Sequence, residues 1–245
     1  MPDFTGRTAL VIGGSSGMGR GAARAYAARG GEVWVTSRAE DRLEQAIAAV
    51  LDGLEPLDGA RATGGVQGVA CDLGDLDSVR AAVARPPELT DLVVSAAPAA
   101  GGTDREFFDG KFWGSQAACA AAAERLPDHG SIVLVSGGMA VRPVAGSWSV
   151  TCAFAAVEAL ARALAVELAP RRVTCIRPGL FDTGTWSAMT PDERERFFAE
   201  RTARLPAGRP ASGADFGDAT VGVLSSAYLT GQVVVLDGGE ALLGG

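Results

Sequence analysis

The chain has 245 residues, of which 47% are hydrophobic and 21% are charged, and its formal net charge is −7. This length and composition fit a single domain with a substantial core, and the acidic balance argues against binding the phosphate backbone of nucleic acids. No uninterrupted apolar run of membrane-spanning length and no charged-then-apolar leader is found, so we expect no membrane partner and a cytoplasmic location.

Short apolar segments rich in Val and Ile alternate with longer amphipathic segments along the chain. The short segments are predicted strands at 8–13, 32–37, 65–71, 91–96, 131–136, 172–177 and 232–237. The longer segments are predicted helices at roughly 17–29, 39–51, 75–84, 104–126, 148–169 and 215–227. This alternation predicts an α/β fold with a doubly wound, seven-stranded parallel sheet between two layers of helices.

We expect one domain over 1–245, with a nucleotide-binding half at about 1–100 and a substrate half at about 101–245. Two stretches break the alternation of strands and helices. The Gly-rich segment 53–65 is predicted to be a loop. The segment 182–212 has mixed polarity and three prolines, and is predicted to be a mobile substrate lid.

A glycine-rich stretch, "VIGGSSGMGRG" at 11–21, follows the first predicted strand and opens the first predicted helix. Glycines at this point allow a sharp turn and a close approach to a pyrophosphate, which the N–H groups of the helix N-terminus then face. The cofactor contacts expected here are Gly13, Ser15, Ser16, Gly17, Met18, Gly19 and Arg20. A glycine-rich turn without a ligand is the alternative.

The second predicted strand ends in "TSR", which places Ser37 and Arg38 where an acidic residue would bind the ribose 2′-hydroxyl of NAD(H). Arg38, Ser37 and Arg20 are instead suited to a 2′-phosphate, so we expect NADP(H) rather than NAD(H) as cofactor. A solvated arginine at a helix start is the alternative for Arg38. After the third strand, Asp72 and Leu73 are expected to meet the adenine, or Asp72 caps the next helix.

The four cysteines, Cys71, Cys119, Cys152 and Cys175, are scattered in apolar runs without a C-x-x-C pair. We expect buried, reduced thiols and no metal site. The single histidine, His129, lies in "LPDHGS" and is expected in a surface turn.

Five segments together resemble the classical short-chain dehydrogenase/reductase family nearly from end to end. They are the glycine loop, with Ile12 in place of a threonine, "CDLGD", "AAVEALARALAVELAP" at 155–170, "IRPGLFDT" at 176–183 and "LTGQVVVLDGG" at 229–239. The resemblance implies a Rossmann-type fold, a small-molecule substrate, and a homotetramer or homodimer. It also implies nicotinamide-side contacts from Ala96, Pro178, Gly179 and Thr183, although "SAAP" at 95–98 departs from the family pattern and Pro98 lacks an N–H group.

The family resemblance also implies a proton relay of tyrosine, lysine, serine and asparagine, in which the lysine holds the ribose. Segment 155–170 sets the register, which places Val150, Phe154, Gly137 and Lys111 at these four positions. The two tyrosines, Tyr26 and Tyr228, are far from this helix in the sequence. We therefore expect an apolar patch of Val150 and Phe154, and weak or absent carbonyl reduction.

Lys111 is the only lysine, and two interpretations of it stay open. It reaches water or pairs with Asp109, or its cation points into the pocket and polarises a substrate carbonyl or binds a carboxylate. Lys111, Ser136 or water is then the proton source of a non-standard NADP(H)-dependent oxidoreductase. A non-catalytic NADP(H)-binding sensor or oligomer partner is the second possibility, and a lyase, isomerase or cyclase without hydride transfer is the third.

Overall fold

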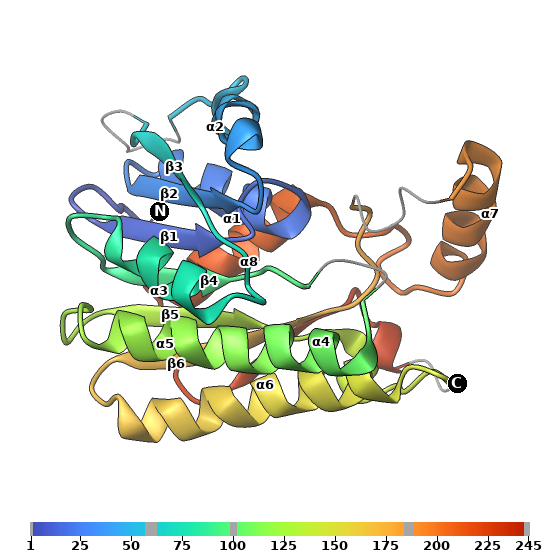
Figure 1. The fold of residues 1–245 in the computed structure, drawn as a ribbon. Helices are drawn as coiled ribbons and strands as arrows, with labels where there is room; N and C mark the ends of the chain where they lie inside the picture. The colour runs from blue at the N-terminus through green and yellow to red at the C-terminus, as the bar shows by residue number, and fades with distance from the viewer. Residues whose placement is uncertain (1, 57–62, 99–101, 184–188, 243–245) are drawn as a thin grey trace.

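A computed structural model describes residues 2–56, 63–98, 102–183 and 189–242 (Figure 1). It contains one seven-stranded sheet in the order β3-β2-β1-β4-β5-β6-β7. The strands are β1 (Thr8–Ile12), β2 (Glu32–Ser37), β3 (Val66–Ala70), β4 (Asp91–Val94), β5 (Ser131–Val135), β6 (Arg172–Pro178) and β7 (Val233–Leu236). All neighbouring strands are parallel, so the predicted Rossmann-type fold is confirmed.

The sheet has a hydrophobic cluster on each face because successive side chains of a strand point to opposite sides. Leu10 of β1 and Leu92 of β4 belong to one cluster, whereas Val11 and Val93, their chain neighbours, belong to the other. Strands β4 and β5 are buried along their whole length, and the edge strands β3 and β7 are only partly buried. The strand order reverses between β1 and β4, and ligands bind at such a crevice, beyond the carboxyl ends of the strands.

Helices cover both faces of the sheet. The helices are α1 (Gly17–Ala27), α2 (Leu43–Leu51), α3 (Leu76–Ala84), α4 (Asp104–Phe108), α5 (Ser115–Ala123), α6 (Trp148–Glu167), α7 (Pro191–Thr202) and α8 (Gly213–Ser225). Buried residues of α1, α2 and α8 belong to one cluster, and those of α3, α5 and α6 belong to the other. Helices α1 and α8 cross closely, since a Cβ atom at Gly21 would overlap the carbonyl oxygen of Gly213.

The predicted continuous helix over 104–126 is wrong in one respect. A π-helical turn, Asp109–Gly114, separates α4 from α5 and carries Lys111. A π-turn holds an extra residue for each hydrogen bond, so it changes which side chains face the sheet, and hydrophobic periodicity does not reveal it.

The predicted lid segment contains helix α7, which the sequence analysis did not identify. Thr190 and Glu193 form a reciprocal capping box, and Pro191 occupies the first turn. These signals of a helix start were present in the sequence. Figure 1 shows α7 standing apart from the sheet, and none of its side chains is buried. Residues 184–188 of the lid and 57–62 of the predicted 53–65 loop lie outside the described residues.

Three of the cysteines are buried as expected, but Cys152 is exposed, so that prediction is wrong. Cys152 lies on the outer face of α6. The sequence of this face is apolar, but no other element of the described fold covers Cys152. By length and composition α6 could cross a membrane, with a mean hydropathy of 1.6 and 33% of that window buried. Its inner face packs against β6 and α4.

His129 is exposed between α5 and β5. No group of three metal-ligating side chains is found in the described part of the chain.

Candidate functional site

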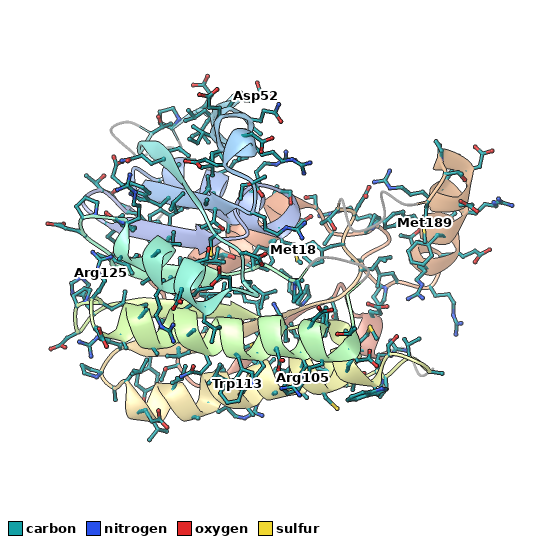
Figure 2. All side chains as sticks on the ribbon, in the orientation of Figure 1. Met18, Asp52, Arg105, Trp113, Arg125 and Met189 are labelled. Atoms are coloured by element: carbon teal, nitrogen blue, oxygen red, sulfur yellow. The ribbon has the colours of Figure 1, made fainter. Side chains whose placement is uncertain are left out.

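A cleft of about 590 Å³ lies at the end of the sheet where the strand order reverses. Figure 2 labels Met18 on this side of the sheet, with Met189 of the α7 segment beyond it. Nearly all the expected cofactor contacts line this one cleft: Gly13, Ser15, Ser16, Gly17, Met18, Gly19, Arg20, Ser37, Arg38, Asp72, Leu73, Ala96 and Thr183. Local sequence signals from the ends of five separate strands therefore converge at a single place.

The glycine loop is folded tightly against the end of β4. Gly13 has a φ of 87°, and a Cβ atom there would lie 2.7 Å from the backbone nitrogen of Ala96. A Cβ atom at Gly19 would overlap the carbonyl oxygen of Gly13. Only glycine fits both positions, so the loop leaves its backbone open to a ligand in the cleft.

The N-terminus of α1 opens into the cleft without a side-chain cap. Ser16 is the N-cap residue, and its hydroxyl makes no capping hydrogen bond. Side chains cap four other helices, at Asp75, Thr103, Thr190 and Ser212, whereas α2, α5 and α6 lack a side-chain cap as α1 does. The uncapped N–H groups and the positive end of the helix dipole suit a pyrophosphate, so the residues present fit a dinucleotide cofactor here.

Arginine side chains surround the outer end of the cleft. Arg20 and Arg38 are exposed and line it, and so does Arg42, which the sequence analysis did not single out. None of the three makes a hydrogen bond or ion pair through its side chain with another described residue. Arg42 lies just after β2 and was recognisable only as a second basic residue close to Arg38.

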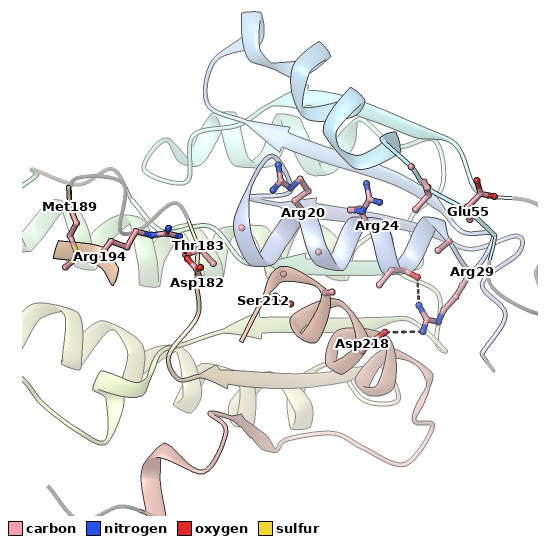
Figure 3. Close-up of a pocket in the computed structure, with 18 of the residues that line it drawn as sticks. Arg20, Arg24, Arg29, Glu55, Asp182, Thr183, Met189, Arg194, Ser212 and Asp218 are labelled. Atoms are coloured by element: carbon pink, nitrogen blue, oxygen red, sulfur yellow. Dashed lines mark hydrogen bonds and ion pairs between the residues drawn. The ribbon is translucent and has the colours of Figure 1, made fainter. Parts of the chain in front are cut away.

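A larger groove of about 960 Å³ runs beside the cleft along α1 and α8 (Figure 3). Its other arginines already have partners. Arg24 donates to the carbonyl oxygens of Ala49, Val50 and Asp52 at the end of α2. Arg29 pairs with Asp218 at 3.4 Å, and Arg194 pairs with Asp182. Arg20, which lines both the groove and the cleft, is therefore the only arginine of the groove without a described side-chain partner, whereas the cleft also has Arg38 and Arg42.

Asp72 is an exposed residue of the cleft lining, and one of its two interpretations is wrong. Its Oδ1 accepts a hydrogen bond from Gly74 N at 2.9 Å, whereas Asp75 caps α3. Asp72 is therefore not the N-cap, and its second carboxylate oxygen has no described partner. Leu73 and Ser37 are buried at the floor of the same cleft.

Pro178 and Gly179 are the two expected cofactor contacts that do not line the described part of the cleft. Gly179 N donates to the carbonyl oxygen of Leu236 at 3.0 Å, and a Cβ atom at Gly179 would lie 2.6 Å from Cβ of Asp237. These two residues lie where β6 meets the end of β7, and Pro178 O approaches Gly138.

Lys111 is buried, with 2% of its surface exposed. Its Nζ donates to the carbonyl oxygen of Ala96 at 2.8 Å and lies 5.8 Å from the centre of the Phe154 ring. Burial lowers the pKa of Lys111 to about 8. Burial of the side chain excludes exposure to water, and Lys111 forms no ion pair with Asp109, which pairs instead with Arg105 at 3.2 Å.

The Phe154 ring fills the space above Gly137. A Cβ atom at Gly137 would overlap Cε2 of Phe154, and the ring meets Phe107 edge to face with centroids 6.1 Å apart. Val150, one turn earlier on α6, is half-buried. This part of the site is therefore an apolar wall beside the Lys111 ammonium group.

Ser136 is buried on the α6 side of β5, and its hydroxyl is already engaged. Its Oγ lies 2.9 Å from Oε1 of Glu158, and the two oxygens of Glu158 accept hydrogen bonds from Arg177 at 2.7 and 2.6 Å. Because the carboxylate can only accept, the Ser136 hydroxyl donates to it. Sequence reasoning did not identify this cluster of Ser136, Glu158 and Arg177.

Neither tyrosine belongs to the site. Tyr26 is buried on α1, and its hydroxyl donates to Asp91 at 2.6 Å. It belongs to the hydrophobic cluster on the opposite face of the sheet from α6. Tyr228 is completely exposed.

Comparisons with known proteins place the whole chain in one family. The family model described as enoyl-(acyl carrier protein) reductase matches residues 12–240. The chain is 30% identical to carbonyl reductase family member 4 of Danio rerio, over 97% of this chain and 99% of that protein. It is 31% identical to the oxidoreductase UcpA of Salmonella typhimurium, over 99% of this chain and 97% of that one.

A solved structure shows the same architecture with a nucleotide bound. A small-chain dehydrogenase in complex with NADPH is 27% identical to this chain and superimposes with a TM-score of 0.77, covering 97% of this chain and 99% of that one. The family model, at residues 12–240, likewise spans both halves of the fold. The chain belongs to the short-chain dehydrogenase/reductase family of NAD(P)-dependent oxidoreductases.

Proposed function

We propose that the protein binds NADP(H) in preference to NAD(H) and has weak or no activity as an ordinary carbonyl reductase. The observation that carries the cofactor preference is the group of three exposed arginines, Arg20, Arg38 and Arg42, at the outer end of the cleft. A 2′-phosphate would give these guanidinium groups charge-assisted, bidentate partners. The small-chain dehydrogenase that this chain resembles was solved with NADPH, which supports the proposal.

The chain's own residues define what each part of the cleft would do. The N–H groups of α1 would hold the pyrophosphate, and Asp72 has a carboxylate oxygen without a described partner that could accept from the adenine amino group. A bound nicotinamide cofactor supplies or accepts a hydride. Ser136 is a poor candidate for the accompanying proton, because its hydroxyl donates to Glu158 and neither residue belongs to the described lining of the cleft.

The weak carbonyl reduction is proposed from the residues at the positions of the family's proton relay. Val150 and Phe154 have no titratable group that could donate a proton to a substrate. The Phe154 ring also leaves no room for a side chain at Gly137. An alkoxide that develops against this wall would find no hydrogen-bond donor on Val150 or Phe154. A second candidate, a non-catalytic NADP(H)-binding protein, is favoured by the same filling of the site.

Arg38→Asp should weaken NADPH binding by roughly tenfold or more, because it removes a charge-assisted contact and adds a repelling carboxylate. Binding of NADH should change less, since it has no 2′-phosphate. Titration of nucleotide fluorescence measures both affinities. Arg85→Asp, at an exposed arginine with no described side-chain partner at the end of α3, is the matched control. Equal affinity of the wild type for NADPH and NADH would contradict the proposed preference.

We also propose a homotetramer or homodimer built through α6. Its outer face exposes a regular stripe of small or apolar residues, Trp148, Cys152, Ala155 and Ala159, which lie one or two turns apart. Small residues allow two helices to approach closely, and an uncovered apolar helix face of this length is costly in water.

Ala159→Glu should convert the assembly to a smaller species, because it would bury a charge at the closest approach of the helices. Light scattering at micromolar concentration gives the mass. Ala199→Glu, at an exposed alanine of α7, is the control and should leave the mass unchanged. A wild type with the mass of a monomer would refute the proposed assembly.

A further inference from the structure

We infer that Lys111 anchors the nicotinamide ribose of the bound nucleotide, from the π-turn between α4 and α5 rather than from α6. The inference rests on the proposed NADP(H) binding. The inferred contact joins Lys111 Nζ to the hydroxyls of the nicotinamide ribose and is separate from the contacts to the phosphates. Lys111 would then bind the cofactor and would not polarise a substrate carbonyl.

The expected direction of a dinucleotide in the cleft brings its nicotinamide half close to Lys111. A dinucleotide lies across the carboxyl ends of the strands, with its pyrophosphate at the N-terminus of α1. The adenosine half would lie toward β2 and β3, where Arg38 and Asp72 line the cleft. The nicotinamide half must then extend over the end of β4, where Ala96 and Ala97 form the lining. Lys111 is not itself part of the described lining, but its Nζ donates to the carbonyl oxygen of Ala96, a residue of that lining, at 2.8 Å.

The hydrogen bonds that Lys111 makes with the described residues leave some of its N–H donors unused. An ammonium group has three N–H donors, and the carbonyl oxygen of Ala96 satisfies one of them. No acidic side chain of the described residues forms an ion pair with Nζ, and the Phe154 ring contributes only a weak attraction at 5.8 Å. A buried cation in this state is costly, so an apolar side chain would be more stable unless a ligand completes the set. The hydroxyls of a ribose are acceptors of the required kind.

The backbone around Lys111 supports a ligand-binding role for this side chain rather than a purely structural one. The π-turn Asp109–Gly114 is the only one in the described chain, and such turns are frequent at functional sites. Gly110, in the same turn, packs against Pro98 so closely that a Cβ atom would lie 2.8 Å from its ring. Ser115 Oγ donates to the carbonyl oxygen of Lys111 at 2.6 Å and holds the backbone of the turn. The turn thus fixes Lys111 against the segment that follows β4.

The test compares two nucleotides that share the phosphate site. NADPH contains the nicotinamide ribose, whereas adenosine 2′,5′-bisphosphate contains only the adenosine with its 2′- and 5′-phosphates. Lys111→Met should raise the Kd of NADPH about tenfold, corresponding to roughly 1.4 kcal/mol, and leave the Kd of the bisphosphate unchanged. Arg38→Asp should weaken both nucleotides. The unchanged bisphosphate affinity also shows that the Lys111→Met variant is folded.

The possible results distinguish a failure of the proposed NADP(H) binding from a failure of the inferred contact between Lys111 and the ribose. If the wild type binds neither nucleotide, the proposed function is refuted, and the inference is refuted with it. If the wild type binds both but Lys111→Met leaves their ratio unchanged, the inference alone is overturned and Lys111 is a structural residue. Should the methionine variant fail to fold, Lys111→Leu, which also lacks N–H donors, is measured instead. A ratio unchanged within about twofold then overturns the inference, and a selective loss of NADPH affinity of about threefold or more supports it.

Discussion

Replacing Arg177 with methionine should lower the free energy of unfolding by about 3 kcal/mol, because it leaves the buried Glu158 carboxylate without its counter-ion. Glu158 is 7% exposed and receives two hydrogen bonds from Arg177, at 2.7 and 2.6 Å. A loss of this size lowers Tm by roughly 6–12 °C in a domain of this length. Thermal and urea unfolding of the two proteins measure it.

Two further variants show whether the unpaired charge is the cause. Arg80→Met removes an exposed pair with Asp77, whose side chains are 58% and 93% exposed, and should cost at most about 0.5 kcal/mol. Glu158→Gln combined with Arg177→Met removes both charges and keeps an acceptor for the Ser136 hydroxyl. This double variant should regain most of the lost stability. If the double variant is no more stable than Arg177→Met, the loss comes from packing, and the ion pair is not the reason.

The Glu158–Arg177 pair also shows why part of the site could not be predicted from the sequence. Nothing in the periodicity of α6 distinguishes Glu158 from a surface glutamate. Arg177, the partner of Glu158, lies on β6, the strand after α6 in the chain. Ser136 follows β5, the strand before α6. They meet because Val135 of β5 is in register with Ile176 of β6, which sets Ser136 beside Arg177. A contact that depends on strand register and helix docking together has no local signal.

The cofactor cleft could be predicted because its signals are local. Gly13 and Gly19 satisfy backbone requirements within a few residues of themselves, and Arg38 follows directly from the end of β2. The same holds for the strands, whose apolar runs reflect burial on both faces. Lys111 was recognisable as an unusual residue, but its contact with Ala96 depends on the π-turn, which shifts the facing side chains by about one residue.

The wild type should not reduce generic ketones with NADPH at an appreciable rate, and four changes together should raise that rate by about 10²–10⁴. The changes are Val150→Tyr, Phe154→Lys, Gly137→Ser and Lys111→Asn. They would supply a proton donor, a lysine on the same face of α6, a hydroxyl to orient the carbonyl, and the amide that the family resemblance implies. NADPH oxidation with small ketones and diketones measures the rate.

The structure explains why the single changes should do little. Gly137 has an extended backbone with φ −169°, which any residue adopts, so serine is excluded there only by the Phe154 ring. Gly137→Ser alone should therefore destabilise the protein, and Phe154→Lys must accompany it. Val150→Tyr alone would place its hydroxyl without a lysine from α6 to lower its pKa, and residues that act as a unit give non-additive effects. If the wild type turns over ketones robustly, another group donates the proton, and Lys111→Met is the next variant to assay. If the quadruple variant binds NADPH but stays inactive, the departure lies elsewhere in the pocket, first at Pro98, whose missing N–H group none of the four changes restores.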